Sequence, residues 1–219
     1  MLHTKLINPK SIAVIGGSND IKKPGGKILF NLIASAFKGK LYVVNPKENE
    51  VQGQPCYNSV SELPDIDLAI LAIPAKACPE TVEVLANTKQ TRGFIIISAG
   101  FSEESHEGAE LEKKIAQTIN SVGGTLIGPN CIGVVNQNYS GVFTAPVPII
   151  DPMGCDFISS SGATAVFIIE SAIPKGLTFA SVYSVGNCAQ TSAEDIAYTI
   201  DVLSDVVTKL RKLNREMAL

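Results

Sequence analysis

The chain has 219 residues, of which 45% are hydrophobic and 18% are charged, and its formal net charge at pH 7 is −3. This length allows one large domain or two small ones, and the apolar fraction excludes intrinsic disorder as the main state. The slightly acidic balance disfavours a general nucleic-acid-binding protein, because that class shows a clear basic excess. No apolar run reaches the roughly 18–20 residues that a transmembrane helix needs, so we expect no membrane span.

The cysteines and the N-terminal segment indicate a compartment. The five cysteines form no CxxC pair, and with only two histidines they fit no zinc pattern, so no metal site is predicted. An odd, scattered set of thiols suits a reducing cytoplasm, where most of them serve as small buried hydrophobic residues. The apolar run Ile12–Ile15 is too short for the core of a signal peptide. We therefore expect a cytoplasmic protein.

Short apolar runs alternate with segments of helical spacing over the first 127 residues. The pattern predicts strands over Ser11–Ile15, Lys40–Val44, Asp67–Ile73, Phe94–Ser98 and Thr125–Ile127, and helices over Lys27–Phe37, Cys78–Ala86 and Glu107–Val122. The segment from 45 to 66 is predicted to be irregular, with a short helix near Ser59–Leu63. Because the strands are apolar throughout, they indicate a parallel sheet covered on both faces, and right-handed crossovers then give a doubly wound, Rossmann-like sheet.

A proline-rich segment divides the chain. Ala145–Gly154 contains three prolines and a glycine, and we interpret it as a linker between a domain over residues 1–145 and a second one over residues 146–219. Beyond it we predict strands over Cys155–Ser159 and Phe179–Ser184 and helices over Ala163–Ile173, Ser192–Leu203 and, with amphipathic spacing, Asp205–Leu219. So small an α/β unit is marginal alone, so we expect it to be incomplete or completed by another chain.

The segments that follow the predicted strands are the candidates for a binding site, because open parallel sheets bind ligands outside the carboxyl ends of their strands. We expect five such segments to converge on one edge: Gly16–Asp20, Asn45–Lys47, Pro74–Lys76, Ser98–Ser102 and Gly128–Gly133.

The first of these segments suggests phosphate binding. Gly16-Gly17 precedes a helix, whose unpaired N–H groups attract anions, and Ser18 and Asn19 add side-chain donors. The pattern is not GxGxxG, and the acidic residue that holds the ribose of NAD after the second strand is missing, since that strand runs into Asn45-Pro46-Lys47. A ligand with several phosphates, such as coenzyme A (CoA), therefore fits better than NAD. The nearby lysines 22, 23 and 27 have two interpretations, as phosphate ligands or as a solvated helix start.

Two further turns carry candidate chemistry. The Cys131 thiol would need a base to act as a nucleophile, and only His3 and His106 are available, so a Cys–His pair is disfavoured and the Asn130-Cys131 loop is expected to shape the site. The turn Ser159–Ala163 (SSSGA) opens a helix after a strand, which suits a second anion site or an ordinary helix cap.

Seven stretches together resemble a known family. They are SIAVIGGS at Ser11–Ser18, GKLYVVNPK at Gly39–Lys47, DLAILAIPAKA at Asp67–Ala77, GFIIISAGFSE at Gly93–Glu103, LIGPNCIGVVN at Leu126–Asn136, SSSGA at Ser159–Ala163 and SVGN at Ser184–Asn187. In this order they are similar to the α-type part of the NDP-forming acyl-CoA synthetases, the superfamily of succinyl-CoA synthetase and ADP-forming acetyl-CoA synthetase.

The resemblance implies a fold, a reaction and a set of site residues. The fold would be a Rossmann-like CoA-binding domain followed by a flavodoxin-like α/β domain, here incomplete. Such enzymes convert an acyl-CoA and phosphate into an acyl phosphate, whose phosphoryl group passes to a histidine and then to ADP or GDP. By resemblance, CoA phosphates would contact Gly17, Ser18, Asn19, Asp20 and Lys47, and the rest of the cofactor would lie along Ile73, Pro74, Ala75, Ala99, Gly100 and Phe101. Asn130 and Cys131 would lie near the thiol, with the Val142–Thr144 segment bordering the acyl group, and Ser161-Gly162 would open the helix that receives the phosphate.

One departure leaves the activity of the chain alone open. The family's phosphohistidine lies in a Gly-His motif of the second domain, whereas no histidine follows Asn187 here, and neither His3 nor His106 matches its position. The nucleotide-binding grasp domain is also absent. No catalytic residue is therefore predicted in this chain. The expected partners are CoA, a small carboxylic acid, and the missing domains or a subunit that bears them, with a second copy of the chain as another docking partner. The alternatives are a non-catalytic CoA or acyl-CoA sensor and an NAD(P)-binding Rossmann protein.

Overall fold

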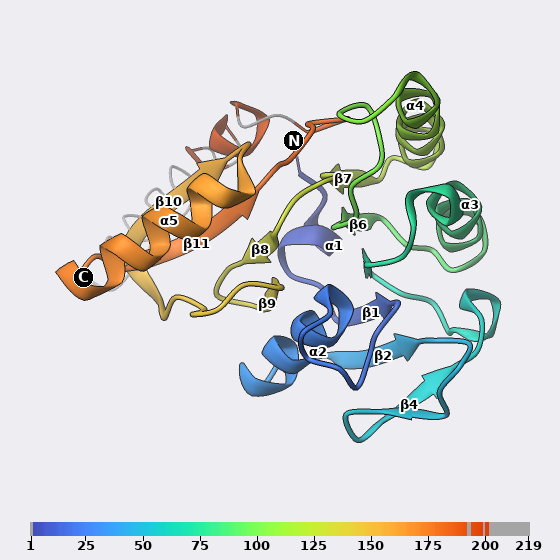
Figure 1. Cartoon of the computed structure of the whole chain (residues 1–219), viewed down its shortest axis with the longest axis horizontal. Coiled ribbons are helices and arrows are strands. Elements are labelled where there is room, and N and C mark those ends of the chain that lie inside the picture. The colour runs from blue at the N-terminus through green and yellow to red at the C-terminus, as the bar shows by residue number, and fades with distance from the viewer. Residues whose placement is uncertain (1, 192–193, 199, 202–219) are drawn as a thin grey trace, which may run out of the picture.

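The computed structural model describes residues 2–191, 194–198 and 200–201. Its larger sheet has seven strands in the order β3-β4-β2-β1-β5-β6-β7 (Figure 1). All neighbours in it are parallel except β3 and β4, which are antiparallel. The strands are β1 (Ser11–Ile15), β2 (Lys40–Val44), β3 (Glu50–Val51), β4 (Gln54–Tyr57), β5 (Leu68–Leu71), β6 (Gly93–Ile96) and β7 (Thr125–Ile127).

Helices cover both faces of this sheet, as the apolar strands predict. Successive side chains of a strand point to opposite faces, so Ile12 and Val14 pack with α2 (Pro24–Ala34), while Ala13 and Ile15 pack with α3 (Cys78–Thr88) and α4 (His106–Ser121) (Figure 1). A short N-terminal helix, α1 (Thr4–Ile7), adds the fully buried Leu6 to the α2 side. The doubly wound arrangement is confirmed.

The segment between β2 and β5 is more regular than predicted. A two-residue turn joins β3 to β4, and both of its residues, Gln52 and Gly53, have positive φ, as type I′ hairpins require. β4 then adds to β2 in parallel, and the 3₁₀ helix η1 (Val60–Glu62) confirms the predicted short helix. The sequence conceals β4 because an edge strand tolerates proline and needs no apolar face, and this one carries Pro55 and is half exposed.

A second sheet of four strands follows in the order β10-β11-β8-β9. β10 (Ile150–Ser159), α5 (Gly162–Ala172), the 3₁₀ turn η3 (Ile173–Lys175) and β11 (Phe179–Ser184) form the predicted parallel unit. β8 (Gly133–Val135) and β9 (Ser140–Val142) form an antiparallel hairpin that the sequence did not reveal, because both are short, contain glycine and are fully buried. The linker prediction is wrong from residue 150 onward, since β10 begins there and is not interrupted by Pro152.

The two sheets share core contacts. Val134, Tyr139 and Tyr183 of the smaller sheet pack in the same cluster as the α2 side of the larger one. The buried Asn31 of α2 donates its amide to the carbonyls of Val142 at 2.7 Å and Thr144 at 3.2 Å. This side chain therefore fixes α2 to the end of β9.

The remaining predictions shift at element ends or lie outside the described residues. The strands predicted to end at Ile73 and Ser98 end at Leu71 and Ile96, so both predicted ends already belong to loops. Residues 194–198 and 200–201 are helical, as predicted, whereas Asp205–Leu219 lies outside the described residues. No helix in the described ranges is long and apolar enough to cross a membrane, and no metal-binding cluster occurs there. All five cysteines are free thiols.

Candidate functional site

The segments that follow the strands of the larger sheet meet at one edge, as predicted. The Asn45 amide donates to the Gly17 carbonyl at 2.8 Å, which links the segments after β2 and β1. The Ser98 hydroxyl donates to the Ile73 carbonyl, and the Asn130 N–H donates to the Ser98 carbonyl at 2.9 Å. The Ala72 N–H, just after β5, donates to the Ile15 carbonyl at the end of β1 at 2.8 Å. The edge is thus a continuous row of hydrogen-bonded segments from β2 to β7.

The first loop folds tightly onto the start of α2. Gly16 has a φ of +86°, and a Cβ there would lie 2.5 Å from the Ala72 carbonyl oxygen. A Cβ on Gly25 would lie 2.1 Å from the Gly16 carbonyl oxygen, so glycine is required at both places. No side chain caps the N-terminus of α2 and no acidic residue lies in its first turn. The backbone N–H groups at this uncapped helix start, together with the helix dipole, therefore suit an anion.

The β3–β4 hairpin holds this loop in place, through a residue that the sequence analysis missed. The Gln52 amide donates to the carbonyls of Ser18 and Gly26, each at 2.8 Å, and the Asn19 side chain accepts the Gln52 N–H at 2.8 Å. The one feature of the local sequence that could have indicated this hairpin is the turn-forming pair Gln52-Gly53. Asp20 is exposed, and its carboxylate accepts the Lys22 N–H within the loop.

The predicted phosphate contact Lys47 and the three lysines with two open interpretations are placed differently from one another. Lys22, Lys23 and Lys47 are exposed, and the Lys47 backbone N–H donates to the Asn45 side chain at 3.0 Å. The Lys27 ammonium instead lies 5.7 Å from the centre of the Phe30 ring, farther along α2. Lys47 is thus next to the strand ends, with its charge free to meet an anion.

Two cavities lie on either side of the β5 end. The first, of about 300 Å³, is bounded by the ends of β1, β2 and β5 and by α3. Its apolar walls include Ile15, Val44 and Ile73, and Ser59 and Ser61 supply hydroxyls, a lining that suits a nucleobase. Of these residues only Ile73 was predicted. The second cavity, of about 490 Å³, includes the predicted residues Pro74, Ala75, Ala99 and Gly100.

Phe101, also predicted to line the cofactor site, has a fully buried side chain in the core. Only its backbone is therefore left to contact a ligand. That backbone N–H and the N–H of Gly100 donate to the Glu103 carboxylate, at 3.2 and 2.7 Å. Burial raises the pKa of Glu103, but hydrogen bonds from Asn187 and from the backbone outweigh it, so the pKa lies below its ordinary value.

A third cavity, of about 440 Å³, joins the two remaining predicted features. It lies between the Asn130-Cys131 loop and the start of α5 at Ser161-Gly162, and Phe143 and Thr144 also line it. Gly162 permits this close approach, since a Cβ there would lie 2.8 Å from the Ile132 side chain. The Ser161 hydroxyl accepts the Thr164 N–H at 3.3 Å, so it acts as the helix cap, and no acidic residue lies in the first turn of α5.

Cys131 is not an activated nucleophile. Its side chain is 3% exposed, and the thiol donates to the Ile96 carbonyl at 3.3 Å. Burial raises the pKa of this thiol to about 12, so it stays neutral at physiological pH. His3 caps α1 through its Nδ1, and His106 begins α4, and neither lines the cavity around Cys131. The predicted shaping role agrees with this geometry.

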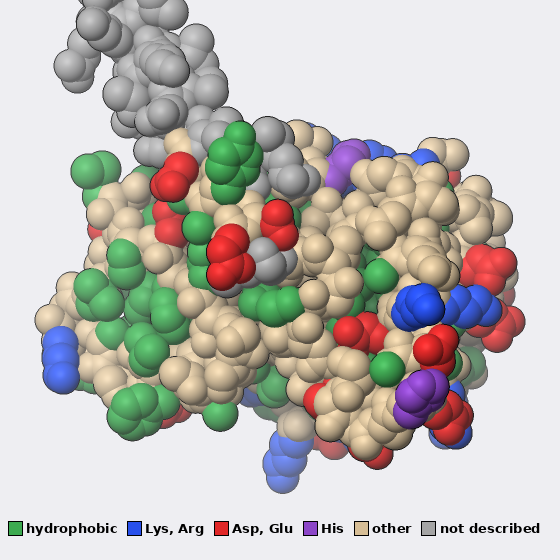
Figure 2. All heavy atoms as spheres, turned by 90° about the horizontal axis from the view of Figure 1, so that it is seen from above, with side chains coloured by type: hydrophobic (Ala, Val, Ile, Leu, Met, Phe, Trp, Pro, Cys, Tyr) green, Lys and Arg blue, Asp and Glu red, His purple; other side chains and the backbone are tan. Residues whose placement is uncertain are grey.

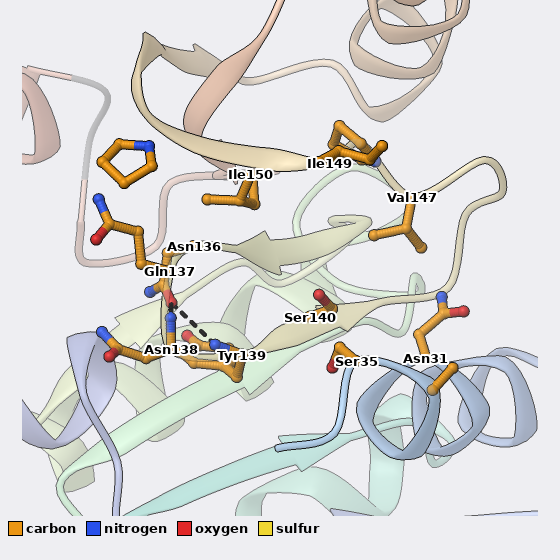
Figure 3. Close-up of a pocket in the computed structure, with 13 residues that line it drawn as sticks. Asn31, Ser35, Asn136, Gln137, Asn138, Tyr139, Ser140, Val147, Ile149 and Ile150 are labelled. Atoms are coloured by element: carbon orange, nitrogen blue, oxygen red, sulfur yellow. Dashed lines mark hydrogen bonds between the residues drawn. The ribbon is translucent and has the colours of Figure 1, made fainter. Parts of the chain in front are cut away.

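A larger cavity, of about 630 Å³, lies away from the strand ends (Figure 3). It is enclosed by the C-terminal half of α2, the β8–β9 turn and the segment from Val147 to Pro152. Asn136, whose side chain accepts the N–H groups of Asn138 and Tyr139, lies at its edge. No charged side chain lines it, and none of the residues predicted for the binding site does. This cavity is therefore separate from the candidate phosphate site at the glycine loop and the start of α2.

Comparison with known families identifies the domain that carries the strand-end loops. A family model described as a CoA-binding domain matches residues 10–137. The chain belongs to this family of CoA-binding domains. The match spans β1 to β8 and therefore includes the strand-end loops of the larger sheet. It supports coenzyme A as the ligand.

The curated relatives of this chain are ligases that are longer than the chain. The chain is 39% identical over 194 residues to acetate–CoA ligase (ADP-forming) I of Archaeoglobus fulgidus, covering 87% of the chain and 28% of that protein. It is 38% identical to the α subunit of acetate–CoA ligase (ADP-forming) II of Pyrococcus furiosus, covering 90% of the chain and 43% of the subunit. The predicted resemblance to the NDP-forming acyl-CoA synthetases is confirmed, and the chain spans less than half of these relatives.

A solved structure supports the fold. The apo form of dinucleotide-forming acetyl-coenzyme A synthetase 1 from Ca. Korarchaeum cryptofilum matches 90% of this chain with a TM-score of 0.83 and 30% identity, over 43% of that protein. The predicted fold class, a Rossmann-like CoA-binding domain followed by part of a second α/β domain, is thereby confirmed.

Proposed function

We propose that this chain supplies the CoA-binding part of an NDP-forming acyl-CoA synthetase that uses a small carboxylic acid. The row of cavities along the strand ends carries the proposal, because its parts suit the parts of CoA in order. The adenine occupies the apolar cavity at the ends of β1, β2 and β5. The phosphates meet the glycine loop, the uncapped start of α2 and Lys47.

The rest of the cofactor follows the same edge. The pantetheine arm runs past Pro74-Ala75 and Ala99-Gly100, and the thiol reaches the cavity at Asn130-Cys131. That cavity also holds the start of α5, where inorganic phosphate would replace the thiol on the acyl carbonyl, giving an acyl phosphate and free CoA. The helix start binds and orients the phosphate, and the apolar walls formed by the buried Ile97 and the partly buried Phe143 limit water.

The phosphohistidine step belongs to a domain or subunit outside this sequence. No histidine follows His106 in the chain, and the relatives extend well beyond the matched region. Apolar side chains gather over α5 and η3, where Phe167 is 69% and Leu177 47% exposed (Figure 2). β10 lies at the edge of the smaller sheet, beside β11. This exposed surface supports docking of the missing part of the second domain. We place the first domain over residues 1–145 and the second from residue 146, so that the β8–β9 hairpin of the first domain completes the smaller sheet.

A non-catalytic CoA or acyl-CoA sensor is the second candidate, because the described site holds no histidine. For either function we propose a cytoplasmic location, which the free thiols support. Incubation with acyl-CoA and phosphate distinguishes the two. Acyl phosphate formed by the chain alone, or by the chain with the histidine-bearing domains added, supports the ligase, and its absence with those domains present supports the sensor.

Calorimetric titration with CoA, dephospho-CoA and NADH tests the proposed site. Lys47→Glu reverses a charge at the carboxyl end of β2, and Lys38→Glu makes the same exposed change near its other end. We expect CoA to bind the wild type and the Lys38 variant alike, and the Lys47 variant about tenfold more weakly, as loss of roughly 1.4 kcal/mol implies. NADH binding without CoA binding would contradict the proposal.

A further inference from the structure

Asn187 connects loops of both sheets at the edge of the candidate site. It follows β11, and its backbone N–H donates to the Pro129 carbonyl at 2.9 Å. Its side-chain oxygen accepts the Asn130 amide at 3.3 Å. The neighbouring Gly186 has a φ of +55°, and a Cβ there would lie 2.0 Å from the Pro129 oxygen. The loop after β11 is thus pressed against the loop after β7.

The Asn187 amide also reaches two carboxylates. It donates to the Glu103 carboxylate, lies 3.0 Å from Oε2 of Glu112 on α4, and lies 3.2 Å from the Ser102 hydroxyl. The Glu112 carboxylate accepts that same hydroxyl at 2.7 Å. Two carboxylates therefore converge on one neutral donor, whose hydrogen bonds offset the repulsion between them.

The hydrogen bonds continue from Glu103 to the cofactor loop. Its other carboxylate oxygen, Oε1, accepts the N–H of Gly100 at 2.7 Å and of Phe101 at 3.2 Å. Gly100 has a φ of +102° and lines the cavity of about 490 Å³ that we assign to the pantetheine arm, whereas Asn187 does not line it. One side chain from the loop after β11 thus fixes, through one carboxylate, the loop that follows β6 in the larger sheet.

We propose that Asn187 is a positioning residue for CoA, which acts on the cofactor loop through Glu103 without touching the ligand. The inference rests on the proposed function. It predicts that part of the second α/β unit is needed for a site built from loops of the first. Removing the Asn187 donor releases Glu103, the N–H of Gly100 loses its fixed acceptor, and the loop must be ordered anew when CoA binds.

The test is CoA titration of the full chain carrying Asn187→Asp, which keeps the size of the side chain but replaces its donor with a third carboxylate. Asn138→Asp is the matched control, because Asn138 is an exposed amide on the β8–β9 turn, away from the strand ends. We expect Kd for CoA to rise about tenfold in the Asn187 variant and to stay unchanged in the control. The control should keep the unfolding midpoint of the wild type, and the Asn187 variant should unfold at a lower midpoint but still be folded at the titration temperature. If Asn187→Asp does not fold, Asn187→Ala is measured in its place with the same expectation.

A double variant separates positioning from a merely structural role. In Asn187→Asp combined with Glu103→Gln, the introduced amide donates to the introduced carboxylate while its oxygen still accepts the Gly100 N–H, so the contact is restored in reverse. We expect most of the lost affinity to return. Wild-type affinity in Asn187→Asp, or no recovery in the double variant, would overturn this inference alone. Failure of the wild type to bind CoA would overturn the proposed function with it.

Discussion

The amide of Gln52 gives the sharpest test of how the phosphate loop is held. Its Nε2 donates to the carbonyls of Ser18 and Gly26, each at 2.8 Å, so one side chain closes the loop from both ends. Hydrogen bonds between neutral groups contribute roughly 0.5–1.5 kcal/mol each, so the pair stabilises the closed loop by about 2 kcal/mol. If that order is needed for CoA binding, losing the amide weakens affinity roughly thirtyfold.

Two substitutions separate the amide from backbone strain. Gln52 has a φ of +50°, a conformation that glycine adopts freely and alanine does not. Gln52→Ala and Gln52→Gly both remove the amide, but only the glycine variant relaxes the turn. We expect both to bind CoA about thirtyfold more weakly in calorimetric titration. Gln137→Ala, which removes an exposed amide from the β8–β9 turn, is the control and should bind as the wild type does. Wild-type affinity in both Gln52 variants, or loss only in the alanine variant, would refute the reasoning.

Three further predictions concern reactivity, stability and pH. Because burial raises the pKa of the Cys131 thiol to about 12, alkylation of the folded protein at pH 8 should modify the exposed Cys155 first, as mass spectrometry of peptides will show, and earlier labelling of Cys131 would contradict this. Asn31→Ala leaves two carbonyls without their buried donor and should lower the free energy of unfolding in urea by about 2 kcal/mol, whereas Asn138→Ala should cost much less. The folded pKa of Glu103 lies below its ordinary value of 4.5, so its stabilisation is complete above pH 4.5 and is lost as pH falls through the folded pKa. The difference in melting temperature between the wild type and Glu103→Gln should therefore shrink on acidification, and a constant difference would argue against it.

The strands that could be predicted are those made of consecutive apolar residues. β1, β2, β5, β6 and β7 are apolar runs because both faces of the sheet are covered. β4, β8 and β9 escape this logic, since one is a half-exposed edge strand with a proline and the others are too short to show a period. The linker was predicted from its prolines, and this prediction failed for a related reason. Pro152 lies within the exposed part of β10, an edge strand, where proline is tolerated.

The site was predictable where it depends on strand ends and hidden where it depends on distant contacts. Gly16-Gly17, Pro74-Ala75 and Asn130-Cys131 each follow a recognisable strand, so the sheet rule found them. Gln52 bonds to residues 26 and 34 positions away, and the Asn187 side chain bonds to residues 57 to 85 positions away. Asn187 ends the SVGN stretch, but neither that stretch nor the Gln52-Gly53 turn indicates which residues these amides contact. These two amides were found only when the fold brought their partners together.

Hydrogen exchange of the backbone amides with and without CoA tests most directly where the cofactor binds. We predict that CoA slows exchange in the loop after β1 and the first turn of α2, and at the segments 45–47, 74–75, 99–100 and 130–131. The cavity between α2 and the segment from Val147 to Pro152 should be unaffected. Protection confined to that cavity, or no protection at the strand ends in CoA-saturated protein, would contradict the account.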